Sequence, residues 1–70
     1  MSYIGSVCGA GVHCIEFSSD AQECITLLIE VAQRNSKSYE PNIQEITEDL
    51  LECGYFEDGL YSYRVVTQPK

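Results

Sequence analysis

The chain has little positive charge and no long apolar run. Its 70 residues include 4 Lys and Arg against 11 Asp and Glu, which gives a formal net charge of -7. Direct binding to DNA, RNA or an anionic membrane is not expected, because contact with phosphates needs clustered Lys and Arg. The longest apolar run, residues 27–29, is far too short for a signal peptide or a membrane span. We therefore expect a cytoplasmic protein.

Motifs for catalysis and cofactor binding are also lacking. His13 is the sole histidine, and its neighbour Cys14 is predicted to point to the opposite side of a strand, so no nucleophile and base are paired. Gly5, Gly9 and Gly11 are not followed by Lys-Ser/Thr and form no phosphate-binding loop. The alternating acidic loop that binds calcium is absent. We expect neither enzyme activity nor a cofactor.

The cysteines give no sign of a metal site. Cys8, Cys14, Cys24 and Cys53 form no CxxC motif, and without a secretory leader free thiols are expected. A zinc site would need Cys8, His13 and Cys14 with a fourth ligand from Cys24 or Cys53, which fall on apolar helix stripes. A small zinc-binding module is therefore the least favoured alternative.

The N-terminal residues are predicted to form a β-hairpin. Residues 3–8 and 12–17 have strand composition, and a three-residue connection through residues 9–11 places Cys8 opposite Val12. This register puts Tyr3, Gly5, Val7, His13, Ile15 and Phe17 on the core side, and Ile4, Ser6, Cys8, Cys14 and Glu16 on the other.

Two helices are predicted to follow the hairpin. The first begins after Asp20, with Glu23 completing a capping box, and runs to about Arg34. Its inward stripe is Ala21, Cys24, Ile25, Leu28, Val31 and Ala32, widened by Leu27 and Ile29. After a polar loop at residues 35–38, the second helix spans residues 41–54, with Pro41 in its first turn and Gly54 just past its end.

The C-terminal part is predicted to add one or two strands. Glu57, Asp58 and Gly59 form a turn between the short segment Tyr55-Phe56 and the strand LYSYRVVT, and residues 68–70 are expected to fray. The order of elements predicts a single α+β domain, residues 1–70. Its N-terminal β-hairpin and its C-terminal strand or hairpin form a small antiparallel sheet, which the two helices cover on one face.

The second helix carries the unbalanced charge. Residues 40–58 contain seven acids and no base, whereas the acids outside this segment are balanced by Arg and Lys. Ile43, Ile46, Leu50 and Cys53 share one face of the helix, and its acids occupy the other. The predicted partner-binding residues are these acids and the aromatic and acidic residues after them: Glu45, Glu48, Asp49, Glu52, Tyr55, Phe56, Glu57, Asp58, Tyr61 and Tyr63.

In its size, its charge and its lack of a catalytic motif, the chain is similar to small phage-encoded inhibitors of host defence nucleases, including anti-CRISPR proteins. This resemblance covers no specific motif, and it implies action in the host cell cytoplasm. The expected partner is a larger protein with a basic, nucleic-acid-binding surface, to which the acids act as a DNA mimic. A homodimeric adaptor or regulatory subunit, paired through Leu27 and Ile29, is the alternative.

Overall fold

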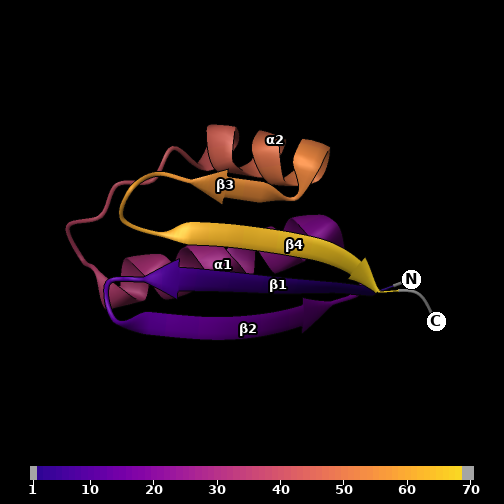
Figure 1. The fold of residues 1–70 in the computed structure, drawn as a ribbon, viewed down its shortest axis with the longest axis horizontal. Helices are drawn as coiled ribbons and strands as arrows, with labels where there is room; N and C mark the ends of the chain where they lie inside the picture. Colours follow the sequence, from indigo (N-terminus) through magenta and orange to yellow (C-terminus); the bar gives the residue numbers. More distant parts are fainter. Residues whose placement is uncertain (1, 69–70) are drawn as a thin grey trace.

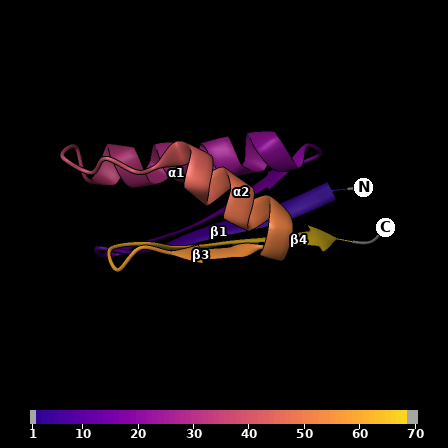
Figure 2. The ribbon, with the colours of Figure 1, turned by 90° about the horizontal axis from the view of Figure 1, so that it is seen from above.

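A computed structural model describes residues 2–68, which form one four-stranded antiparallel sheet with two helices on one of its faces (Figures 1 and 2). This confirms the predicted α+β fold with an N-terminal hairpin and C-terminal strands. The elements in chain order are β1 (Ser2–Gly9), β2 (Val12–Ser18), α1 (Ala21–Asn35), α2 (Ile43–Cys53), β3 (Tyr55–Glu57) and β4 (Ser62–Gln68). Gln68, predicted to fray, ends β4, while Pro69 and Lys70 lie outside the described residues.

The strand order in the sheet is β2-β1-β4-β3. β1 is central and pairs along its length with β2, its neighbour in the chain, and with β4, the last strand. Seven pairs join β1 to β4, from Ser2 opposite Gln68 to Cys8 opposite Ser62, whereas β3 and β4 share three. The edges of the sheet are therefore β2 on one side and the short strand β3 on the other.

The register of the first hairpin differs by one residue from the prediction. Gly9 belongs to β1 and lies opposite Val12, and the turn consists of Ala10 and Gly11, both at positive φ. A one-residue shift turns every side chain of one strand to the other face. The predicted inward positions of β1 are therefore correct and those of β2 are wrong. Ile15 and Phe17 are 52% and 66% exposed on the face without helices.

Gly9 explains this shift in register. Its φ is +144°, and a Cβ built there would lie 2.2 Å from the carbonyl oxygen of Leu60 and 2.9 Å from Cα of Tyr61. The close approach of the Leu60-Tyr61 backbone fixes Gly9 at the end of the strand, so only two residues remain for the turn. This contact is between segments fifty residues apart, which no local pattern reveals.

The helices begin and end close to their predicted caps. The Asp20 carboxylate accepts a hydrogen bond from the N–H of Gln22, while Glu23 accepts one from the Ser18 hydroxyl instead of completing a capping box. Asn42 caps α2, so Pro41 precedes the helix rather than lying in its first turn. Gly54 ends α2 in the left-handed conformation, as predicted, with φ +77°.

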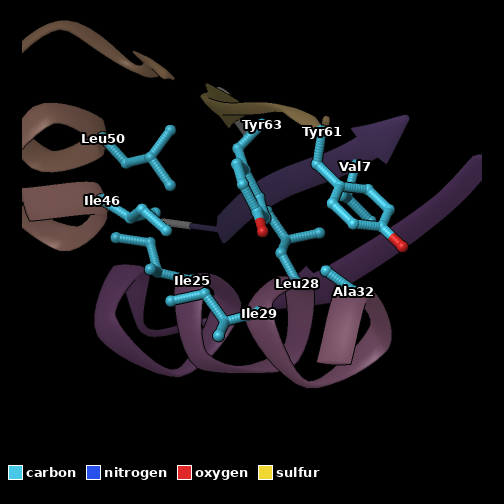
Figure 3. Close-up of a cluster of buried hydrophobic side chains, with 9 residues drawn as sticks. All are labelled: Val7, Ile25, Leu28, Ile29, Ala32, Ile46, Leu50, Tyr61 and Tyr63. Carbon is cyan, nitrogen blue, oxygen red and sulfur yellow. The ribbon is translucent and has the colours of Figure 1, made fainter. Parts of the chain in front are cut away.

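The core lies between α1, α2 and the inner face of the sheet (Figure 3). It is made of Val7, Ile25, Leu28, Ile29, Ala32, Ile46, Leu50, Tyr61 and Tyr63. Ile29 is 4% exposed, so it cannot form the dimer contact that the sequence suggested. Ile43 and Cys53, predicted on the buried stripe of α2, are exposed, which leaves Ile46 and Leu50 as the buried residues of this helix.

Candidate functional site

The acids of α2 form one continuous surface, here called the acidic face: Glu45, Glu48, Asp49 and Glu52. Their spacing of three and four residues places them on one side of the helix, away from the buried Ile46 and Leu50. Glu45, Glu48 and Glu52 are exposed and Asp49 is half-buried. α2 lies beside β3 at the edge of the sheet, as Figure 1 shows, so this surface faces outward.

The acidic face lowers the stability of its own helix. Glu45 and Asp49, and also Glu48 and Glu52, are like charges four residues apart, and each such pair costs a few tenths of a kcal/mol. Glu45 lies in the first turn, where the helix dipole favours an acid, but Glu52 lies near the other end, and the last turn contains no basic residue. The helix is held by its caps and its two buried side chains rather than by its surface charges.

Asp58, predicted to contact a partner, is part of a hydrogen-bonded turn. One carboxylate oxygen accepts the N–H groups of Leu60 (3.0 Å) and Tyr61 (2.9 Å), and the other accepts the hydroxyl of Tyr39. Partial burial raises the pKa of Asp58, but these hydrogen bonds outweigh it and hold the pKa below its ordinary value. Both oxygens of the Asp58 carboxylate therefore accept hydrogen bonds within the chain.

Tyr61 and Tyr63, also predicted to contact a partner, lie in the core at 1% and 0% exposure. Their hydroxyls are hydrogen-bonded inside the molecule: the amide of Asn35 donates to Tyr61 Oη at 2.9 Å, and the hydroxyls of Tyr63 and Tyr39 lie 2.8 Å apart. A buried ring cannot contact a partner, so this part of the predicted surface is corrected. Tyr39 was not among the predicted site residues, because it lies in the connection between α1 and α2, where no pattern marked it.

The residues of β3 alternate between the two faces of the sheet. Tyr55 is 42% exposed, donates a hydrogen bond to Glu57 at 2.9 Å, and has the Arg64 guanidinium 5.7 Å from its ring centre. Phe56 is half-buried against Tyr63. Because Phe56 faces inward, its neighbours Tyr55 and Glu57 lie on the face of the sheet opposite the helices. Tyr55 and Glu57 are thus separated from the acidic face of α2.

The tyrosine network predicts unfolding at alkaline pH. Burial, together with hydrogen bonds to Asp58 and Tyr63, raises the pKa of Tyr39, and burial also raises the pKa of Tyr63. Each hydroxyl therefore stabilises the fold fully below the ordinary tyrosine pKa of about 10, and this contribution is lost as the pH rises above it. We expect the tyrosinate absorbance of these two residues to appear only together with loss of the far-UV circular dichroism signal.

The control for this titration is the double variant Tyr39→Phe/Tyr63→Phe. It lacks both hydroxyls whose pKa is raised. Its free energy of unfolding should therefore fall less than that of the wild type as the pH rises from neutral to alkaline values. Ionisation of all five tyrosines near pH 10 with an intact circular dichroism spectrum would contradict the hydrogen-bonded network.

The described residues were also compared with the requirements of a metal site, a charged pocket and a membrane span. Among residues 2–68 no group of three His, Cys, Asp or Glu side chains is placed to hold a metal ion. A cavity of about 370 Å³ lies between the end of α2 and the sheet, and its lining, which includes Leu50, Leu51 and Val65, contains no acidic, basic or histidine side chain. No helix in the described part of the chain is long and apolar enough to cross a membrane.

Comparisons with known proteins identify no relative of this chain. No protein family, no curated protein and no solved structure matches it. Any functional conclusion therefore depends on the geometry and charge of its own residues, of which the acidic face is the most unusual arrangement.

Proposed function

We propose that the protein is a non-enzymatic inhibitor that docks its acidic face onto the basic, nucleic-acid-binding surface of a larger protein. The observation that carries the proposal is a short helix, held by Ile46 and Leu50, that displays four carboxylates with no Lys or Arg in residues 40–58. Because this arrangement lowers the stability of the helix, we attribute its presence to a role in binding. A basic surface would neutralise the carboxylates and steer association.

The spacing of the carboxylates suits a DNA mimic. Glu45 and Glu52 are seven residues apart, or about 10.5 Å along the helix at 1.5 Å per residue. The four acids lie at axial intervals of about 4.5, 1.5 and 4.5 Å. Their mean charge density along the axis, one per about 3.5 Å, is close to that of a DNA strand, one phosphate per about 3.4 Å. Small phage-encoded inhibitors of defence nucleases, anti-CRISPR proteins among them, share the size and charge of this chain, and the proposal places the protein in that functional class.

Charge reversal on α2 tests the proposal. We expect Glu48→Lys/Glu52→Lys to keep the fold, because both side chains are exposed, and to lose at least about tenfold in affinity. The wild-type chain, immobilised, should capture from a host lysate a nucleic-acid-binding protein that is released by duplex DNA or by salt. The variant should capture little of it.

The matched control is Glu23→Lys/Glu30→Lys, which makes the same change in net charge on exposed positions of α1. It should bind like the wild type, because its charges lie outside the acidic face. Equal capture by both variants, or a captured protein that DNA does not release, would contradict the proposal.

A further inference from the structure

The geometry points to an interaction surface on the other side of the molecule: we propose that the free edge of β2 pairs antiparallel with β2 of a second copy. The result is a two-fold symmetric dimer with one continuous eight-stranded sheet. This inference is independent of the acidic face, because α2 lies over β3 and β4 at the opposite edge.

β2 has the features of an edge open to pairing. It runs for seven residues, VHCIEFS, with an uninterrupted register to β1 and no Lys, Pro or bulge, and Glu16, half-buried, is its one acidic residue. Natural proteins usually protect their edge strands with such features, because unpaired backbone groups recruit other strands. The opposite edge, β3, is three residues long and lies next to α2. β2 is therefore the edge with the capacity to add a strand.

The hairpin turn determines which backbone groups of β2 are free. Gly9 and Val12 close the two-residue turn as a hydrogen-bonded pair, so alternate residues after Val12 also bond to β1. The residues between them, His13, Ile15 and Phe17, direct their N–H and C=O groups away from β1. These residues must form the hydrogen-bonded pairs with any added strand.

A two-fold axis at Ile15 uses all seven residues of β2. Ile15 then lies opposite Ile15 of the second copy, and His13 lies opposite Phe17, so that each hydrogen-bonded pair joins residues whose backbone groups are free. Ile15 and Phe17 are 52% and 66% exposed in the single chain, and this pairing brings them together across the new contact. The exposed apolar side chains of β2 thus gain neighbours.

The helices fit the same arrangement. α1 packs on β1 and β2, on the face of the sheet that the helices cover. One side of α1 carries Leu27, Val31 and Arg34, and the first two are half-buried. In the proposed dimer this side of the helix is directed to the contact.

The charges at the contact are complementary. The amide of Asn35 donates a hydrogen bond to the Ala10 carbonyl at 3.3 Å, which places the end of α1, and with it Arg34, beside the β1–β2 turn. Burial and Glu16 raise the pKa of the Cys14 thiol, and the positive charge of Arg34 lowers it. In the proposed register Cys14 lies opposite Glu16 of the second copy, so Arg34 of each copy approaches Glu16 of the other. The two acidic faces lie far apart at the outer ends, where their repulsion is screened.

Two lysine variants of the full chain test the proposal by sedimentation equilibrium. Wild type should be a dimer, and Ile15→Lys should weaken dimerisation at least about tenfold, because two like charges would lie opposite each other. Val66→Lys is the matched control: Val66 is 47% exposed on the same face but in β4, so this variant should remain a dimer. A dimer formed by stacking of the sheet faces would be weakened by both substitutions, which would overturn the edge-pairing proposal.

A charge exchange tests the register. Glu16→Arg and Arg34→Glu should each weaken the dimer, and the double variant Glu16→Arg/Arg34→Glu should restore it, with circular dichroism showing that each variant is folded. Failure of the folded double variant to recover would overturn the proposed register. A wild-type chain that sediments as a monomer at all concentrations would overturn the dimer itself.

Discussion

Replacing Gly9 with alanine is expected to leave the protein largely unfolded. The added Cβ would lie 2.2 Å from the carbonyl oxygen of Leu60 and 2.9 Å from Cα of Tyr61, and neither is a flexible side-chain end that can move aside. Backbone strain at positive φ and forced overpacking each cost about 1–3 kcal/mol. A core of this size supplies only about 3–5 kcal/mol, so their sum approaches the whole stability of the fold.

Gly11→Ala provides the matched comparison. Gly11 also has a positive φ, +83°, but a Cβ there would have no atom within 4 Å. Only the backbone strain remains, which amounts to about 1–2 kcal/mol. Urea unfolding followed by far-UV circular dichroism measures both variants. Equal losses at Gly9 and Gly11 would show that the end of β1 does not pack against the Leu60-Tyr61 backbone.

Truncation of Ile46 to alanine is expected to lower the free energy of unfolding by about 2–5 kcal/mol. Ile46 is fully buried and, with Leu50, it joins α2 to the core. Removing its methyl groups loses their transfer free energy and leaves a cavity that the neighbouring side chains fill only in part. The loss should be measured as a lower urea midpoint with an unchanged slope.

Ile43→Ala in the same helix is the control. Ile43 is 54% exposed, so its truncation should change stability by no more than about 0.5 kcal/mol. A large loss from Ile43 and a small one from Ile46 would mean that α2 docks through a different face. That result would also change which carboxylates face outward, and so it bears on the proposed binding surface.

Local signals were sufficient to predict the elements of the fold. Asp20 and Gly54 mark a helix start and a helix end through their own backbone and side-chain chemistry, and the structure places them there. The spacing of Ile46 and Leu50 likewise predicted the buried side of α2, and with it the outward position of the acids. The register of the first hairpin was not predictable, because it depends on contact between Gly9 and residues fifty positions later.

The same distinction applies to the candidate site. The carboxylates of α2 could be assigned to one surface because a helix fixes their mutual positions. Tyr61 and Tyr63 are two residues apart and therefore lie on the same side of the chain. Their burial depends on which side the helices cover. The partners of their hydroxyls are the distant residues Asn35 and Tyr39. Hydrogen bonds between remote segments leave no periodic signal in a sequence.

The central position of β1 has a consequence for how the chain folds. Its partner β2 follows it directly, but its other partner, β4, is separated from it by both helices, and Ser2 pairs with Gln68. The pairing of β1 with β4 can therefore form only after the chain has extended past both helices to residue 68. Closing so long a loop early is entropically costly, and we expect a folding rate typical of proteins with non-local contacts, slower than that of helical bundles of equal length.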